Sequence, residues 1–152
     1  MSKVAIVMGS RSDMEIMQST ADTLNDFNIS YEFFTISAHR TPEKAREFAS
    51  SAKERGFKVI IAGAGYAAHL PGVIASWTTL PVIGIPIPSS ALAGVDSLYA
   101  IVQMPAGIPV ATVTIGKAGA KNAAYLAAEI LALNDTEISE KLRIYRQELS
   151  NS

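Results

Sequence analysis

Short apolar runs alternate with longer segments whose apolar residues recur every three or four positions, and this alternation limits the fold more than any other feature. The first run, residues 4–8, ends at Gly9, and residues 13–27 then carry apolar side chains at helical spacing. Runs this apolar are typical of strands buried on both faces, and strands separated by helices are typical of parallel sheets. Because such crossovers are right-handed, helices cover both faces. The sequence therefore predicts an α/β protein, a three-layer α/β/α sandwich around a parallel, doubly wound sheet.

The expected elements fill most of the chain. We expect strands at residues 4–8, 30–36, 58–62, 81–85 and 110–115, and helices at 13–27, 42–56, 94–103, 118–133 and 137–149, with one more opening at His69. Thr41 is expected to cap the second helix, with Pro42 in its first position. Residues 1–134 are expected to form the α/β domain. Residues 135–152 are expected to carry a C-terminal helix that packs on the same or a neighbouring subunit.

The charged residues and the absent cysteine exclude several function classes. Lys and Arg number 13 and Asp and Glu 14, so the net charge is −1 and no basic excess is available to neutralise a nucleic acid backbone. Without cysteine there is no disulfide, thiol nucleophile or zinc–thiolate site. The two histidines do not by themselves complete a usual transition-metal site. We therefore expect a small-molecule partner, no nucleic acid and no metal.

One long stretch of the chain is almost free of charge. From residue 59 to residue 116 the only charged side chain is Asp96, for which we expect a buried structural role. No segment offers about 18 unbroken apolar residues, so we expect no membrane span. The stretch is then expected to be buried inside the domain, against sister subunits, or both. The apolar run at residues 4–8 is too short for a signal peptide, which favours a cytoplasmic protein.

Three expected strands are each followed by polar or small residues. The loops cover residues 9–13, 37–42 and 63–69, and they contain both histidines of the chain, His39 and His69. In a parallel sheet these loops share one edge, and ligands bind beyond the carboxyl ends of the strands. The sequence therefore predicts one site built from all three loops.

The first two loops carry groups that suit a phosphate ester. Ser10 and Ser12 lie just before an expected helix, whose free N–H groups attract anions, although a plain turn capped by Ser12 or Asp13 has the same pattern. Arg40 suits phosphate oxygens but is also compatible with an ordinary surface arginine. Asp13 is a candidate acceptor for sugar hydroxyls. The loop has neither a Walker nor a dinucleotide pattern.

Proton transfer is assigned to the histidines. His39, between a small residue and Arg40 at the end of a strand, is the better candidate, because histidine titrates near neutral pH. His69 is either catalytic or only bonded to local backbone groups. Residues 63–65 form either a small-residue floor for a flat ring or carboxylate, or simply a tight turn.

Five motifs together resemble one known family. They are Gly-Ser-x-Ser-Asp at 9–13, Ser-Ala-His-Arg-Thr-Pro at 37–42, Gly-Ala-Gly-x-Ala-Ala-His-Leu-Pro-Gly at 63–72, Gly-Val-Asp-Ser-Leu at 94–98 and Val-Gln-Met-Pro-x-Gly-Ile-Pro-Val-Ala-Thr at 102–112. In order and spacing they resemble the N5-carboxyaminoimidazole ribonucleotide mutase family, the class I catalytic subunit of phosphoribosylaminoimidazole carboxylase. The resemblance covers roughly residues 4–133.

The resemblance implies a flavodoxin-like, cytoplasmic homo-octamer that needs no cofactor. It implies a reaction of purine biosynthesis in which a carboxylate moves from the exocyclic nitrogen to the ring carbon of an aminoimidazole ribonucleotide, through release and recapture of carbon dioxide. By position it implies His39 as general acid/base and His69, counted with it as catalytic, in the wall of the carboxylate and ring pocket. The substrate-binding residues it implies are Gly9, Ser10, Ser12, Asp13, Ser37, Ala38, Arg40, Gly63, Ala64, Gly65, Tyr66 and Leu70.

Tyr66 departs from the family pattern, which has glycine at this position. If the position requires a positive φ, the tyrosine strains the loop. Two other functions share the expected fold. One is a class II-type carboxylase that uses free carbon dioxide and the uncarboxylated ribonucleotide. The other is a non-catalytic flavin or mononucleotide module, for which Tyr66 and Trp77 are the aromatic candidates.

Overall fold

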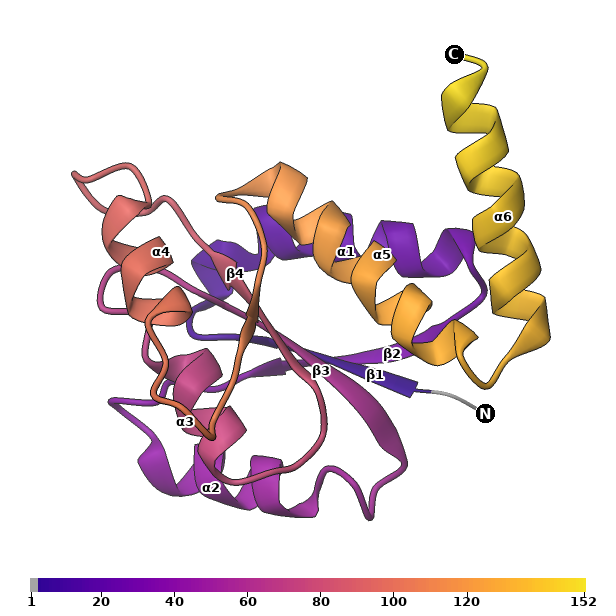
Figure 1. The fold of residues 1–152 in the computed structure, drawn as a ribbon. Coiled ribbons are helices and arrows are strands. Elements are labelled where there is room, and N and C mark those ends of the chain that lie inside the picture. Colours follow the sequence, from indigo (N-terminus) through magenta and orange to yellow (C-terminus); the bar gives the residue numbers. More distant parts are fainter. Residues whose placement is uncertain (1–2) are drawn as a thin grey trace.

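Five parallel strands form the central sheet of the computed structural model, which describes residues 3–152 (Figure 1). The strands are β1 (Lys3–Met8), β2 (Ser30–Thr35), β3 (Phe57–Ala64), β4 (Val82–Pro86) and β5 (Ala111–Thr112). A 3-10 helix at Arg11–Asp13 precedes the helices α1 (Met14–Asp26), α2 (Pro42–Ser51), α3 (Leu70–Ser76), α4 (Val95–Val102), α5 (Lys117–Ala132) and α6 (Thr136–Ser150). The strand order is β2-β1-β3-β4-β5, the doubly wound order of flavodoxin-like sheets. The predicted fold class is confirmed.

Alternate side chains of the strands enter two separate cores. Ile6 and Met8 of β1 lie in the core under α1 and α5, whereas Ala5 and Val7 lie in the core that α2 and α3 cover. All four side chains are at most 2% exposed. This explains why the runs of the inner strands β1, β3 and β4 are continuously apolar rather than alternating, because neither face of these strands meets water.

Helices α1 and α5 pack closely because the buried face of α5 consists of alanines. Ala120, Ala123 and Ala127 are fully buried there. The small side chains let the two backbones approach, and the buried Thr20 hydroxyl of α1 donates a 2.8 Å hydrogen bond to the Ala120 carbonyl. The contact holds α1 firmly, and with it the loop that precedes α1 at the edge of the sheet.

Three expectations about the ends of elements are wrong. Helix α2 ends at Ser51 rather than at Gly56, because backbone turn bonds such as Phe57 N–H to the Ala52 carbonyl lead the chain into β3. Strand β5 contains only two residues, since its ladder with β4 spans two residue pairs at the edge of the sheet. Thr41 does not cap α2 with its side chain, because its hydroxyl donates to the Ser37 carbonyl instead.

The uncharged stretch is buried only in part. Its strands β3 and β4 are almost wholly buried, but α4 and the loops around it expose large apolar side chains. They are Leu92, Val95, Tyr99, Val102 and Ile108. Burial within one chain therefore explains the strands and leaves α4 with an uncovered apolar face. Among residues 3–152, no helix combines the length and hydropathy that a membrane crossing requires.

The last helix begins against the domain and then leaves it. Ile138 of α6 lies in the core under α5, and Tyr145 stacks on Tyr125 with ring centroids 4.6 Å apart. Beyond this point α6 projects away from the sheet (Figure 1). The part of α6 up to Arg146, which forms a 3.0 Å ion pair with Glu129 of α5, thus packs on its own chain.

Candidate active site

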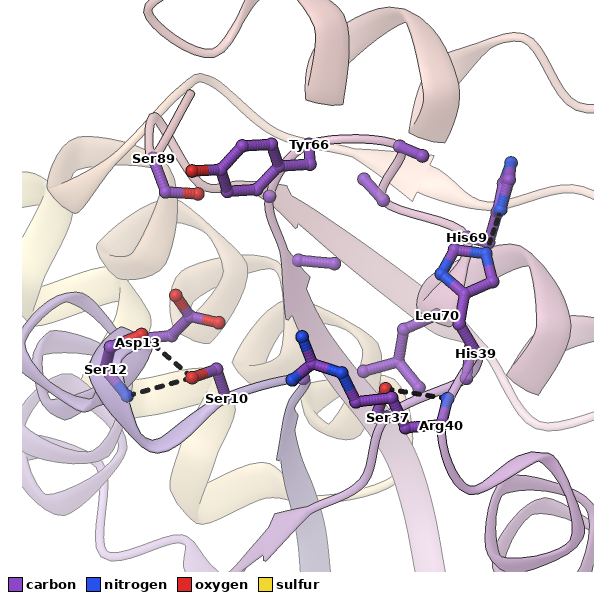
Figure 2. Close-up of a pocket in the computed structure, with 16 residues that line it drawn as sticks. Ser10, Ser12, Asp13, Ser37, His39, Arg40, Tyr66, His69, Leu70 and Ser89 are labelled. Atoms are coloured by element: carbon purple, nitrogen blue, oxygen red, sulfur yellow. Dashed lines mark hydrogen bonds between the residues drawn. The ribbon is translucent and has the colours of Figure 1, made fainter. Parts of the chain in front are cut away.

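Four loops at the carboxyl edge of the sheet surround one cavity of about 660 Å³ (Figure 2). They follow β1, β2, β3 and β4, and the cavity lies near the point where the chain reverses its winding, since β1 sits between β2 and β3. This is the position that doubly wound sheets use for ligands. The three loops predicted to converge do so, and a fourth joins them.

The loop after β1 presents two hydroxyl groups at the start of a helix. Ser10 has an extended backbone and caps the 3-10 helix, and its oxygen lies 2.9 Å from the Ser12 oxygen and 3.3 Å from the Ser12 nitrogen. Both serines are exposed on the cavity wall. Two exposed hydroxyl groups at the N-terminal end of a helix are suited to bind an anion.

Asp13 lies directly beside these serines but is buried, with 8% of its surface exposed. Burial raises the pKa of the Asp13 carboxyl above its ordinary value, and a backbone hydrogen bond from Ser10 opposes that rise only in part. A buried acceptor at a cavity wall suits a pair of hydroxyl groups from a ligand. It does not suit a phosphate, which carries the same charge.

The loop after β2 is held by bonds between its own residues. The Thr41 hydroxyl donates to the Ser37 carbonyl at 2.8 Å, and the Ser37 hydroxyl accepts from the Arg40 backbone nitrogen at 3.1 Å. These bonds satisfy the loop's polar groups and leave the side chains of His39 and Arg40 free to reach the cavity (Figure 2). Among residues 3–152, no carboxylate forms an ion pair with Arg40, so its guanidinium can bind a ligand anion.

The two histidines contact each other. Nε2 of His39 lies 2.5 Å from Nδ1 of His69, and the rings meet edge to face with centroids 4.7 Å apart. Two ring nitrogens this close share a proton, because two unprotonated nitrogens would repel each other. His69 occupies the N-cap position of α3, but its side chain makes no capping bond and faces His39 instead. The pair is therefore a unit able to hold a proton at the cavity wall.

The loop after β3 has a strained turn. The Ala68 nitrogen donates to the Gly65 carbonyl at 2.9 Å, which closes a β-turn with Tyr66 in its second position. Tyr66 has a φ of 53° and Ala68 a φ of 37°. A side chain in the left-handed region costs about 1 kcal/mol or more, and glycine is the residue such positions favour. The expected strain at Tyr66 is present.

Gly65 lines the cavity, and a neighbouring side chain occupies the space that any larger residue at position 65 would need. A Cβ atom on Gly65 would lie 2.0 Å from the hydroxyl oxygen of Ser89, which itself lines the cavity. The loops after β3 and β4 therefore touch at this point. A larger residue at position 65 would push Ser89 and its loop away.

Nearly all the residues predicted for the site line this cavity. They are Gly9, Ser10, Ser12, Asp13, Ser37, Ala38, His39, Arg40, Ala64, Gly65, Tyr66, His69 and Leu70. Gly63 does not line it. It is buried inside β3, and a Cβ atom there would lie 2.5 Å from the sulfur of Met17, so glycine is needed at that position for packing.

Sequence reasoning missed Ala67, Ala68 and Ser89. Ser89 is the second residue after the buried Ile87 and the first polar one after β4, so the rule that led to the other three loops would have found it. Trp77 does not line the cavity. It ends α3, half exposed, with the Arg46 guanidinium 5.7 Å from its ring centroid. The paired aromatic rings expected of a flavin site are thus not assembled.

The cavity walls differ at their two ends. Ser10, Ser12 and Asp13 lie on one side and the two histidines on the other, with the Arg40 side chain between them (Figure 2). Within residues 3–152, no group of three or more His, Asp or Glu side chains is arranged to hold a metal ion. The arrangement suits a ligand with a phosphate and a sugar at one end and a small ring that exchanges a proton at the other.

Comparisons with known proteins show the family of the chain. Residues 3–152 match the family model described as AIR carboxylase. The N5-carboxyaminoimidazole ribonucleotide mutase of Pyrococcus abyssi is 60% identical over 149 residues, covering 98% of this chain and 84% of that protein. The protein of the same name from Escherichia coli strain K12 is 58% identical over 145 residues, covering 95% and 86%.

Solved structures show the same fold. The crystal structure of Treponema denticola PurE superposes with a TM-score of 0.89 at 33% identity, covering 99% of this chain and 93% of that one. A 3-dehydroquinate dehydratase-like protein from Bifidobacterium longum superposes with a TM-score of 0.55 at 18% identity, covering 87% and 99%. The second likeness concerns the fold alone.

Proposed function

The chain belongs to the AIR carboxylase family, and we propose from this premise that it is an N5-carboxyaminoimidazole ribonucleotide mutase of de novo purine biosynthesis. It converts the N5-carboxylated aminoimidazole ribonucleotide into the isomer that carries the carboxylate on the ring carbon. The observation that supports this reaction most directly is the meeting of an anion-binding turn and a contacting histidine pair in one cavity.

The phosphate and the ribose of the substrate bind at the turn after β1. The phosphate accepts hydrogen bonds from Ser10, Ser12 and the first N–H groups of the helix, and the Arg40 guanidinium approaches it from the other side. The buried Asp13 carboxylate accepts hydrogen bonds from the ribose hydroxyl groups. These contacts lie away from the reacting bond, so they fix the position of the imidazole in front of the histidines.

The reaction is an isomerisation, and its atoms and electrons balance within the substrate. The C–N bond of the carbamate breaks, its electron pair stays on the exocyclic nitrogen, and that nitrogen takes a proton from His39. The ring carbon then attacks the released carbon dioxide with an electron pair of the aminoimidazole. His39 removes the proton from that ring carbon, which restores the aromatic ring and returns the proton that His39 gave.

His69 keeps His39 in position and shares its proton. The 2.5 Å contact aims the His39 ring, and the exposed side chain of His39 would otherwise rotate freely. When His39 gives up or takes a proton, the bond to His69 rearranges rather than breaks. The remaining walls include the small, uncharged residues Ala38, Ala64 and Gly65, which limit the space around the released carbon dioxide.

We also propose that the chain assembles as a homo-octamer, as the family resemblance implies. The uncovered apolar side chains on and around α4 support an assembly, since a patch of this kind marks a contact surface in proteins that are soluble. The surface includes Leu92, Val95, Tyr99 and Val102. Light scattering at micromolar concentration tests the proposal, and a monomer would contradict it.

An assay with two substrates tests the proposed reaction. Purified protein is mixed either with the N5-carboxylated ribonucleotide in carbon dioxide-free buffer, or with the uncarboxylated ribonucleotide and bicarbonate, and the product is followed by its ultraviolet absorbance. The proposal expects rapid conversion of the carbamate without added bicarbonate. Product formed only from the uncarboxylated ribonucleotide would instead indicate a carboxylase that uses free carbon dioxide.

A further inference from the structure

The backbone conformation of Tyr66 raises the free energy of the folded state, and burial of its side chain does not compensate for this strain. Its backbone lies in the left-handed region with a φ of 53°, where glycine is favoured, yet its side chain is 62% exposed. An exposed ring does not repay backbone strain through burial. Strain of this kind persists where the surrounding structure imposes it, and it is concentrated at functional sites.

The ring of Tyr66 lies along the edge of the cavity. Figure 2 shows it extending from the end of β3 towards Ser89, with its hydroxyl group directed to that side. Ser89 belongs to the loop after β4, and its hydroxyl group packs against the backbone of Gly65. The ring thus lies over the contact between the loops after β3 and β4, at the edge of the cavity, where glycine would place no side chain.

We propose that the Tyr66 ring is a retaining wall that keeps carbon dioxide inside the cavity between the two half-reactions. The inference rests on the proposed mutase reaction, in which this gas is the only fragment that leaves the ribonucleotide. The charged and hydroxyl-bearing groups hold the phosphate and ribose, but carbon dioxide is small and uncharged, so they do not hold it. Only the shape of the cavity retains it, and escape competes with attack by the ring carbon.

Retention of carbon dioxide is assigned to the ring of Tyr66 and not to its hydroxyl group or its backbone conformation. Tyr66→Phe keeps the ring without the hydroxyl group. Tyr66→Ala removes the ring and keeps a side chain at a positive φ, whereas Tyr66→Gly removes the ring and also relieves the strain. Asn28, another exposed residue with a positive φ of 56°, lies outside the cavity lining, and Asn28→Gly is the matched control for strain relief.

The experiment follows the exchange of carbon dioxide during turnover. Each variant converts unlabelled N5-carboxylated ribonucleotide in buffer that contains ¹³C-bicarbonate and carbonic anhydrase, and mass spectrometry measures the labelled fraction of the earliest product. Wild type, Tyr66→Phe and Asn28→Gly should incorporate little label. Tyr66→Ala and Tyr66→Gly should incorporate several-fold more and should release more uncarboxylated ribonucleotide for each product formed. Thermal melts show that each variant is folded.

The possible results distinguish a failure of the role proposed for Tyr66 from a failure of the proposed mutase reaction. Equal labelling in all variants that turn over the carbamate would overturn the role of Tyr66 and leave the mutase reaction intact. Labelling in Tyr66→Phe as high as in Tyr66→Ala would also overturn it, because the hydroxyl group would then be responsible. Failure of the wild type to convert the carbamate would overturn the reaction itself.

Discussion

Replacing His39 by asparagine should remove most of the turnover and leave ribonucleotide binding almost unchanged. Asparagine keeps a side chain that donates and accepts hydrogen bonds near His69, but it does not carry a proton between substrate atoms. The groups assigned to the phosphate and the ribose, Ser10 and Asp13, lie on the β1 loop and are not altered. The loss should therefore appear in kcat and not in the dissociation constant of the product.

The geometry of the pair sets the size of the effect. A positioned acid/base contributes about 10²- to 10⁴-fold to the rate. His39 is the ring assigned to the substrate proton, and His69, 2.5 Å away, acts only through it. We therefore expect a loss of about 10²-fold or more, which is about 2.7 kcal/mol or more in the activation barrier.

The matching variants show whether the histidines act as one unit. His69→Asn should lower kcat less than His39→Asn, and the double variant should lose little more than His39→Asn alone, since effects within a unit are not additive. Initial rates from ultraviolet absorbance give kcat, and calorimetric titration with the carboxylated product gives affinity. Near-normal turnover of His39→Asn, or losses that multiply in the double variant, would refute the reasoning.

Three further changes test the other parts of the molecule. Burial raises the pKa of Asp13 in the folded state, so the free energy of unfolding falls as pH rises from the pKa of the unfolded chain through the raised pKa of the folded one. Asp13→Asn should therefore melt at a higher temperature than the wild type at neutral pH and lose this advantage in acid. It should also bind the ribonucleotide more weakly. Arg40→Met should raise KM by about ten- to hundredfold with a smaller change in kcat, because one charged hydrogen-bonding group is lost from the phosphate; an unchanged KM would remove Arg40 from that role. Tyr145→Ala should lower the free energy of unfolding in urea by about 1–3 kcal/mol, because Tyr145 forms aromatic pairs with Tyr125 and Phe27 at centroid distances of 4.6 and 6.2 Å.

The sequence was most informative where one physical cause controlled the pattern. Apolar runs such as residues 4–8 are typical of strands buried on both faces, and their alternation with helix-like segments predicted the sheet and its parallel direction. Once the strands are parallel, their carboxyl ends share an edge, so His39 and His69 had to approach each other. The sequence did not predict the direct contact between the two rings, because this contact depends on the rotamers of two exposed side chains.

The errors come from positions where two local causes compete. Thr41 has the pattern of a helix cap, but its hydroxyl also reaches the Ser37 carbonyl, and the bond that closes the loop is the one that forms. Gly63 and Gly65 look equivalent in the sequence. In the fold, Gly63 makes room for Met17 inside the sheet layer, whereas Gly65 makes room for Ser89 at the cavity, and only the tertiary contacts distinguish the two.

The two ends of the cavity differ in the way that the proposed reaction requires. The phosphate and the ribose do not change during the reaction, so strong contacts there stabilise the substrate and the transition state equally and serve to position the ring. At the other end, the negative charge of the carbamate moves to the exocyclic nitrogen as neutral carbon dioxide leaves, and a carboxylate forms again when the ring carbon attacks, so a fixed cation beside the carboxylate would stabilise the carbamate and oppose its cleavage. The chain places Ser10, Ser12 and Asp13 at the first end and the histidine pair at the second, with Arg40 between them (Figure 2). The only group assigned to the reacting end is therefore one that can give a proton to the nitrogen and later take one from the ring carbon, so it assists both half-reactions without holding either carboxylated ribonucleotide more tightly.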